Sequence, residues 1–382
     1  MILFLITFLL VYGGLHLYAF LKVRAAFSFG TQANIVLVLF MLLMVLSPII
    51  VRFAERSGFE LFARVLSYIG YIWMGILVLF IAASLVFDFY RFMLCASGLI
   101  LKKDFSRFMI PHVYAFLIPL AVSLVVTVYG YFEAKGIKTE KVVIKTEKIP
   151  TEIGTLKIVQ ISDVHIGLIM GEERLKKILH IVKSENPDIL VSTGDLLDGQ
   201  SDDISIIADL FKGIKPRYGK FAITGNHEFY AGLAHSLQFL KEAGFTVLRG
   251  ERASVAGILQ VVGVDDPAGK RYALYDNISE RELLAELPQD TFTLFLKHRP
   301  VVDTGSIGFF DLQLSGHVHK GQIFPLSIIT GILYPVQEGL AYLSNNSYLY
   351  VSRGTGTWGP PIRVFAPPEV TVIELVNPRD FT

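Results

Sequence analysis

The first third of the chain is almost continuously apolar, whereas the remaining two thirds alternate short apolar runs with polar stretches. Four apolar segments are long enough to cross the hydrocarbon layer of a membrane, which is roughly 30 Å thick. They cover about residues 2–20, 35–51, 68–86 and 109–130. No acidic residue lies at the centre of a segment, which disfavours ion or proton transport. We therefore predict a transmembrane domain with four helices over residues 1–132.

The flanks of these segments indicate how the chain sits in the membrane. The first segment lacks a basic start and a small-residue cleavage site, so we expect it to remain as an anchor. Basic residues in short loops favour the cytoplasmic side of an inner membrane. The first and third loops hold six of them, whereas the second holds three: Lys22, Arg24, Arg91, Lys102, Lys103 and Arg107 against Arg52, Arg56 and Arg64. This count predicts an extracytoplasmic C-terminal domain, although five lysines between residues 135 and 148 favour the opposite orientation.

Two polar segments border the last of these spans. Residues 90–108 mix Phe, Leu and Ile with Arg and Lys, and either an amphipathic surface segment or a plain loop fits this pattern. Residues 133–150 form a Lys- and Glu-rich connector whose middle, residues 142–146, can form a first strand. The single cysteine, Cys95, excludes an internal disulfide.

Residues 151–382 predict a separate α/β domain. Apolar, β-branched runs indicate strands at residues 156–162, 188–193, 220–224, 291–297 and 311–315. Amphipathic periodicity indicates helices at residues 172–185, 203–211 and 233–243. Further strand-like segments follow at residues 245–248, 258–264, 348–352 and 369–376. A pair of mixed sheets flanked by helices fits this order better than a single parallel sheet.

Each of the five main strands ends in a short polar motif. These are Asp163-Val164-His165, Gly194-Asp195-Leu196-Leu197-Asp198, Gly225-Asn226-His227-Glu228, Lys297-His298 and Gly316-His317-Val318-His319. Ligands of open α/β sheets bind at the carboxyl ends of strands, so the motifs can converge. Carboxylate, imidazole and amide groups suit Mn, Fe or Zn, and no cysteine takes part. Two such ions ~3.5–4 Å apart are the usual apparatus for displacing an oxygen at phosphorus.

These motifs, in this order, resemble the calcineurin-like metallophosphoesterase superfamily over about residues 142–375. The local sequence around His298 and His317 is similar to sequences of the membrane-anchored bacterial branch of that superfamily. Val318 and Lys320 stand where that branch more often has Thr and Gly, and neither change affects a ligand. The resemblance implies a four-layer α-β-β-α sandwich.

The resemblance also implies a role for each polar residue. One divalent metal ion would be held by Asp163, His165 and His319, and a second by Asn226, His298 and His317. Asp195 would bridge the two ions. His227 would stabilise the developing charge or protonate the leaving oxygen, with Asp198 as its orienting carboxylate. Arg299 and Lys320 would contact the substrate phosphate.

The predicted function is hydrolysis of a phosphate ester by in-line attack of a metal-bridging hydroxide. A phosphodiester or pyrophosphate bond in a lipid-linked or envelope substrate is preferred, because four spans hold the site near a bilayer. A phosphomonoesterase or protein phosphatase remains an alternative, with specificity in loops such as residues 325–346. A non-catalytic membrane sensor is a further alternative. The net charge of +1 gives no reason to expect nucleic acid.

Two other segments were open to either a structural or a functional interpretation. Asp265-Asp266-Pro267 follows a strand and predicts a turn, although it could line the site. Residues 354–361 are rich in Gly and Pro and predict a loop, either closing over a substrate or without any ligand role. The remaining histidines are expected to have packing or surface roles: His16, His112, His180 and His235.

Overall fold

The computed structural model describes residues 2–199, 204–275 and 278–381. The chain divides into two compact units. A helical unit comprises Met1–Phe132 with Gly359–Val364, and a catalytic unit comprises Glu133–Trp358 with Phe365–Thr382. The first residue of the helix predicted at 203–211 lies outside the described residues.

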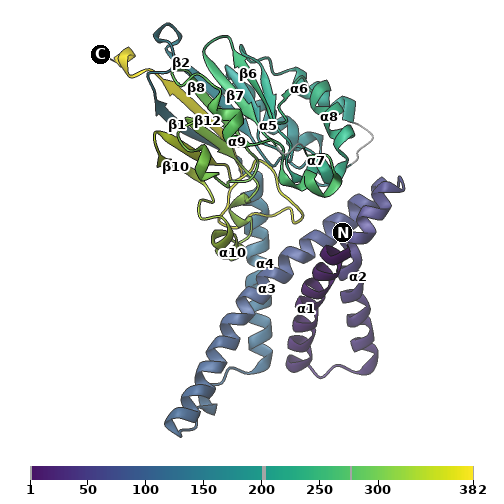
Figure 1. Cartoon of the computed structure of the whole chain (residues 1–382). Coiled ribbons are helices and arrows are strands. Elements are labelled where there is room, and N and C mark those ends of the chain that lie inside the picture. Colours follow the sequence, from purple (N-terminus) through teal and green to yellow (C-terminus); the bar gives the residue numbers. More distant parts are fainter. Residues whose placement is uncertain (1, 200–203, 276–277, 382) are drawn as a thin grey trace. The chain divides into compact units, whose positions relative to one another are not determined.

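The helical unit contains the four predicted spans, which confirms that part of the interpretation (Figure 1). The helices are α1 (Ile2–Ala26), α2 (Thr31–Arg56), α3 (Glu60–Leu101) and α4 (His112–Lys135). Each is long and apolar enough to cross a membrane. They pack through a cluster that includes Tyr12, Met41, Leu77 and Phe116. A Cβ on Gly70 of α3 would lie 2.4 Å from Ser47 Oγ of α2, so this crossing requires a glycine.

Helix α3 is much longer than the span expected within it. It has 42 residues, which corresponds to about 63 Å at 1.5 Å per residue and roughly twice the hydrocarbon thickness. The interpretation of residues 90–108 as a plain loop is therefore wrong for Tyr90 to Leu101. No proline interrupts this stretch, and the helix ends only where Lys102 adopts a left-handed backbone with φ of 50°. A short 3-10 turn, Ser106–Phe108, precedes α4.

The catalytic unit contains two mixed sheets of six strands each. The first sheet has the order β1 (Lys138–Lys145), β12 (Glu369–Val376), β2 (Thr155–Ile161), β3 (Ile189–Ser192), β4 (Lys220–Ala222) and β5 (Thr246–Val247). Strands β2 to β5 are parallel, and β12 runs antiparallel to β2. Strand β1 begins four residues before the predicted position because its pairing with β12 extends back to Lys138.

The second sheet has the order β10 (Gly339–Ser344), β11 (Ser347–Val351), β9 (Leu312–Ser315), β8 (Phe292–Leu296), β7 (Leu259–Gly263) and β6 (Glu251–Val255). Strands β7, β8, β9 and β11 are parallel. The outer strands β6 and β10 are antiparallel to their neighbours.

Helices cover the outer face of each sheet. Helices α5 (Glu172–Ser184), α6 (Ile204–Lys212) and α8 (Leu233–Glu242) pack on the first sheet, and α9 (Glu280–Ala285) packs on the second (Figure 1). Neighbours on β2 face opposite ways, with Ile158 between the sheets and Val159 under the helices. This arrangement confirms the predicted four-layer sandwich.

Shorter elements lie in the connections. The α-helices among them are α7 (Asn226–Ala231) and α10 (Leu326–Leu333). The 3-10 turns are Thr151–Ile153, Pro267–Tyr272, Thr304–Ser306, His319–Gly321 and Pro378–Phe381. The predicted loop at residues 325–346 therefore consists largely of α10 and β10.

Candidate metal centre

The predicted ligand residues form two adjacent groups at the strand ends. In one group Asp163, His165 and His319 offer ligand atoms within 4.8 Å of one another. In the other, Asp195, His298 and His317 do the same. The Nε2 atoms of His165 and His319 are 3.1 Å apart, and Nδ1 of His317 is 3.2 Å from Nε2 of His298. Four separate motifs thus deliver ligand-type atoms to one place.

Asp195 lies between the two groups. Its Oδ2 atom is 3.2 Å from His298 Nε2 and 4.0 Å from His165 Nε2. Asp163 Oδ1 lies 3.4 Å from His319 Nε2, and both oxygens of Asp163 accept from the backbone N of His317 at 3.0 Å. Asp195 therefore lies close to imidazole nitrogens of both groups.

The backbone at these positions is strained. Five of the seven proposed ligands have a left-handed φ: Asp163, His165, Asp195, His317 and His319. Such conformations cost of order 1–3 kcal/mol each in a non-glycine residue and concentrate at functional sites. The glycines of the motifs leave room for this geometry. A Cβ on Gly316 would lie 2.2 Å from Asp163 Oδ2, and one on Gly225 would lie 2.1 Å from Asp195 Oδ1.

Asn226 provides a test of whether cations fit. It is buried, and its Oδ1 atom has no hydrogen-bond partner among the described residues. Leaving a buried acceptor unsatisfied costs ~1–3 kcal/mol, so a ligand is expected at this oxygen. Amide, carboxylate and imidazole donors together suit first-row divalent ions. The residues present therefore fit a metal centre.

The charges at the centre also call for cations. Burial alone would raise the pKa of Asp163, but the charge of His319 and its hydrogen bond hold this pKa well below its usual range. Burial opposes ionisation of Asp195 too, yet the charges of His298 and His227 lower its pKa. Both carboxylates are thus ionised in a buried site, where uncompensated negative charge is costly.

The imidazoles respond to the same field. Burial would lower the pKa of His298, but the charge of Asp195 and its hydrogen bond raise that pKa to about 10. The pKa of His317 is lowered to about 3 by burial and by the positive charge of His298. The negative charge of the carboxylates therefore favours the protonated form of His298. A bound divalent ion would supply positive charge in place of that proton.

His227 is oriented by Asp198. Its Nδ1 atom lies 2.5 Å from Asp198 Oδ1, and its backbone N donates to Asp195 Oδ1 at 2.8 Å. Burial would lower the pKa of the ring, but the charges of Asp195 and Asp198 and the hydrogen bond with Asp198 raise it to about 9. The ring contacts the edge of His165, with centroids 4.7 Å apart. It thus lies beside the ligand groups.

Glu228 is a residue whose part in the site the sequence analysis missed. Its buried carboxylate accepts hydrogen bonds from the backbone N of Gly225 at 2.7 Å, Asp195 at 2.9 Å and Leu196 at 2.7 Å. The bond to Gly225 is half of a capping box, because Glu228 is the third residue of α7. That spacing is a signal that could have identified it. Glu228 ties the second motif to the third.

The two predicted substrate contacts already have carboxylate partners. Arg299 binds Asp266 through Nε at 2.7 Å and Nη2 at 3.0 Å. Lys320 Nζ lies 2.5 Å from Glu338 Oε1. Asp266 also accepts from Ala268 N at 2.7 Å, so the expected turn at residues 265–267 forms and holds Arg299 as well. The substrate roles of Arg299 and Lys320 stay predictions.

The Gly-rich loop near residue 355 supports the first motif. Thr355 N donates to Ser162 O at 2.7 Å, and Gly356 N donates to Asp163 O at 3.0 Å. A Cβ on Gly356 would lie 2.1 Å from Val164 O, so only glycine fits there. This part of the loop is a backbone brace for the strand end that carries Asp163.

Aromatic side chains border the centre, and sequence analysis did not identify them. Tyr230 and Trp358 contact the His227 ring, with centroids 5.3 and 6.0 Å away, and Tyr334 contacts His317 at 5.7 Å. The Trp358 side chain is 56% exposed. Its backbone N donates to Gln322 Oε1, and its backbone O accepts from Gln322 Nε2. These residues come from three separate connections, so no motif joins them in the sequence.

Comparisons with known proteins identify the class of this site. Residues 156–321 match the calcineurin-like phosphoesterase family. An uncharacterised metallophosphoesterase from Aquifex aeolicus is 38% identical over 257 residues, covering 66% of this chain and 97% of that protein. One from Campylobacter jejuni, Cj0846, is 32% identical over 335 residues, covering 85% and 87%. The chain therefore belongs to the calcineurin-like metallophosphoesterase family and is a metal-dependent phosphoesterase.

A vertebrate relative extends the comparison. A zebrafish (Danio rerio) transmembrane protein with a metallophosphoesterase domain is 32% identical over 271 residues, which are 67% of this chain and 61% of that protein. The family resemblance is confirmed, but relatives occur in animals as well as in bacteria. With its four long apolar helices, this chain is a membrane protein.

Proposed function

We propose that this enzyme hydrolyses a phosphodiester or pyrophosphate bond in a lipid-linked or envelope substrate. The observation that carries the lipid part of the proposal is the exposed apolar helix α10, which is the next helix after the His319–Gly321 turn. The phosphoester chemistry itself rests on the convergence of the ligand groups described above.

In this proposal the seven ligands divide into two sets that share Asp195. Asp163, His165 and His319 would hold one divalent ion, and Asn226, His298 and His317 would hold the other. Bound Mn, Fe or Zn ions would supply positive charge against the phosphoryl oxygens and acidify water at the site. The glycines of the motifs keep the strand ends close together.

His227 holds the proton that the leaving oxygen needs. The Nδ1–H group of His227 donates its hydrogen bond to Asp198. Nε2 is therefore the ring atom that can give a proton to the substrate. Asp198 acts as a positioning residue because it selects this tautomer and favours the protonated ring.

Helix α10 provides an apolar surface beside this centre. Four of its residues are more than half exposed: Ile328 (59%), Ile329 (57%), Ile332 (78%) and Leu333 (68%). The helix contains no charged residue. Tyr334, the next residue, contacts the proposed ligand His317. Exposed apolar patches mark interaction sites, and in a membrane protein lipid is the partner at hand. An acyl chain on α10 would bring an attached phosphate near the centre.

We also propose that the helical unit lies in the inner membrane and that the catalytic unit is on its extracytoplasmic side. The support is the excess of basic residues at and near the α1–α2 and α3–α4 connections over those at and near the α2–α3 connection. We further propose that the membrane domain ends near residue 132, that residues 133–150 connect it to the hydrolase domain, and that this domain spans residues 151–382.

A turnover assay with small reporters tests the chemistry. Purified, Mn-loaded wild-type chain should hydrolyse a nitrophenyl phosphodiester faster than the corresponding monoester. Asp195→Asn and His227→Ala should each lower turnover at least about 100-fold, as for loss of a general acid or a metal bridge. Asp209→Asn is the matched control, because Asp209 is exposed on α6 and pairs with Lys212, three residues along the same helix.

Two results would count against the proposal. Equal turnover by the wild type, Asp195→Asn and His227→Ala would refute the assigned residues. A clear preference for the monoester would replace the diesterase proposal with the phosphomonoesterase alternative.

A further inference from the structure

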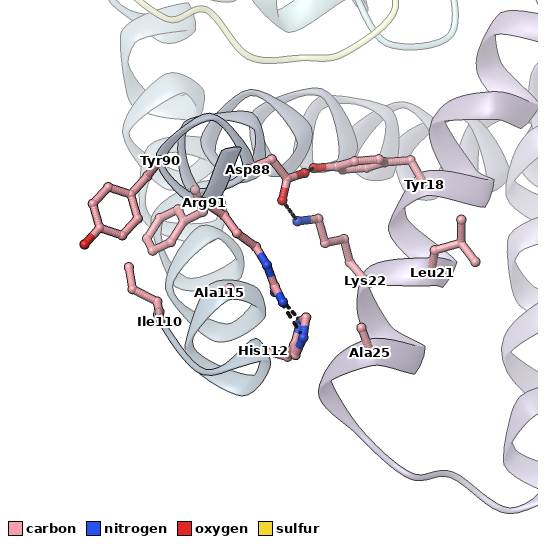
Figure 2. A pocket seen from close by; sticks show the side chains of 11 residues that line it. Tyr18, Leu21, Lys22, Ala25, Asp88, Tyr90, Arg91, Ile110, His112 and Ala115 are labelled. Carbon is pink, nitrogen blue, oxygen red and sulfur yellow. Dashed lines mark hydrogen bonds and ion pairs between the residues drawn. The ribbon is translucent and has the colours of Figure 1, made fainter. Parts of the chain in front are cut away.

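The helical unit contains a cavity with charged side chains in a largely apolar lining, and the catalytic site does not use it. It has a volume of about 360 Å³ and lies between α1, α3 and the start of α4 (Figure 2). Its polar lining includes Tyr18, Lys22, Asp88, Arg91 and His112. The expected spans stopped short of Lys22 and Asp88, but the helices extend past both residues. Charged groups therefore lie within helices that are otherwise apolar.

One part of the cavity wall is already neutralised. Lys22 of α1 forms an ion pair with Asp88 Oδ1 of α3. Tyr18 OH donates to the other carboxylate oxygen of Asp88 at 2.5 Å. Both oxygens of this carboxylate are thus engaged, and its one negative charge can neutralise only one of the two positive charges, those of Lys22 and Arg91, that lie near it.

Arg91 supplies a second positive charge without a second carboxylate. Its Nη1 atom lies 3.0 and 3.2 Å from the two ring nitrogens of His112 (Figure 2). Within residues 2–199, 204–275 and 278–381, Arg91 forms no ion pair with an acidic side chain. The cavity therefore has two permanent cations and one anion. A guanidinium among membrane helices is costly unless an anion compensates it.

The positions of these residues along the helices indicate which anion is at hand. Lys22 lies one turn before the end of α1 at Ala26, and His112 is the first residue of α4. Helix ends of this kind meet the headgroup layer, where long basic side chains reach phosphate. Leu21 and Ile110 add apolar surface to the same lining. A headgroup phosphate with an attached glycerol and acyl chain matches both kinds of surface.

We propose that this cavity binds the phosphate of an anionic membrane phospholipid, with Arg91 as the principal donor and Lys22 and His112 beside it. The guanidinium can donate two hydrogen bonds to one phosphate, a geometry that favours Arg for phosphate recognition. This site lies wholly within the helical unit and does not depend on the substrate proposed above.

Native mass spectrometry of the purified full-length chain in detergent tests the proposal. The chain is titrated with phosphatidylglycerol, with phosphatidylcholine and with water-soluble glycerol phosphate. Wild type should retain phosphatidylglycerol in preference to phosphatidylcholine. Arg91→Gln should weaken that binding at least about ten-fold, as expected for loss of a charged donor. Arg91→Lys keeps the positive charge but loses the bidentate guanidinium, so its affinity for phosphatidylglycerol should lie between those of the wild type and Arg91→Gln.

Arg64→Gln is the matched control, because Arg64 is exposed on the same helix α3 and pairs with Glu60. It should bind phosphatidylglycerol as the wild type does. Turnover of a soluble reporter verifies that each variant is folded. Binding unchanged in Arg91→Gln, or lowered equally in Arg64→Gln, would overturn the proposed site. Glycerol phosphate displacing the lipid at equal concentration would overturn the lipid as the occupant and leave a site for soluble phosphates.

Discussion

At the metal centre, the backbone conformations of single residues are stabilised by hydrogen bonds from neighbouring residues. Asp163 and Asp195 adopt left-handed conformations, and their backbone groups form hydrogen bonds with residues from other parts of the chain. Gly356 N binds the carbonyl of Asp163, and Glu228 binds the amide of Asp195. The strain at the ligands is therefore offset by hydrogen bonds from residues that are not themselves proposed ligands.

Replacing Glu228 by Gln should loosen this support. Gln keeps one acceptor but turns an NH₂ group towards backbone N–H donors, so at least one buried amide loses its partner. We expect a loss of ~1–3 kcal/mol in the free energy of unfolding. Metal affinity should fall ~10–100-fold, as for other groups that orient ligands. Thermal unfolding and metal titration measure the two effects.

The control for this variant is Glu173→Gln, since the Glu173 side chain is 86% exposed. It should leave both quantities unchanged. Normal metal affinity in Glu228→Gln would show that Asp195 does not depend on this carboxylate.

Replacing Asp198 by Asn should change the pH dependence of turnover. The protonated His227 ring is the active form, so the rate falls on the alkaline side as pH passes its pKa, which Asp195 and Asp198 raise to about 9. Removing the Asp198 charge lowers this pKa, so the alkaline limb of the pH–rate profile should move to lower pH. The Asp209→Asn profile should match the wild type. An alkaline limb that stays in place would argue against His227 as the proton donor.

The seven proposed ligands and the His227–Asp198 pair follow from the resemblance of the motifs to the family, and their roles stay predictions. The structure brings six of the seven ligands together in two groups: Asp163, His165, His319, Asp195, His298 and His317. Tyr230, Tyr334 and Trp358 were not predictable, because their proximity depends on how three unrelated connections fold. The partners of Arg299 and Lys320 depend in the same way on Asp266 and Glu338.

Among the elements, helix α10 is one that the sequence did not predict. Its sequence, Leu326–Leu333, is β-branched and apolar without a regular polar face, so it was treated as part of a loop. Strand β6 was missed for a different reason. It is an outer strand, and most of its side chains are exposed or half-buried, so no clear alternation marks it.

Replacing Ile328 and Ile332 of α10 by Ser should weaken the use of lipid-borne substrates. Each side chain loses ~1.5–3 kcal/mol of burial if lipid covers it, so KM should rise at least about ten-fold for a phosphodiester in vesicles. Turnover of a soluble diester should not change. Initial rates on both substrates measure the difference.

Ile206→Ser is the matched control, because Ile206 is 53% exposed on the distant helix α6. It should affect neither substrate. A loss of activity on the soluble diester equal to that on vesicles would mean that α10 supports the fold, and no loss on vesicles would exclude lipid contact there.

For the whole molecule, the division into an apolar and a polar part was evident from composition alone. The number of spans was predictable because the length of each apolar run lies within the range of roughly 17–25 residues that a spanning helix needs. Their true lengths were not, since α3 continues through residues whose composition is mixed but which contain nothing to end a helix.

The orientation proposal predicts which side of the membrane a label reaches. Two single-cysteine chains, Lys177→Cys and Lys103→Cys, are made with Cys95 replaced by Ser. Lys177 is exposed on α5 of the catalytic unit, and Lys103 lies in the third loop. In right-side-out vesicles, a membrane-impermeant maleimide should label Lys177→Cys, whereas Lys103→Cys should react only after permeabilisation. The reverse pattern would place the catalytic unit in the cytoplasm.

The central claim is that five strand ends gather two cations around Asp195. Anomalous diffraction from crystals of the Mn-loaded full-length chain tests this most directly. The account predicts two anomalous peaks, one contacting Asp163, His165 and His319 and the other contacting Asn226, His298 and His317, with Asp195 touching both. A single peak, or peaks held by other residues while Asp195 contacts none, would contradict it.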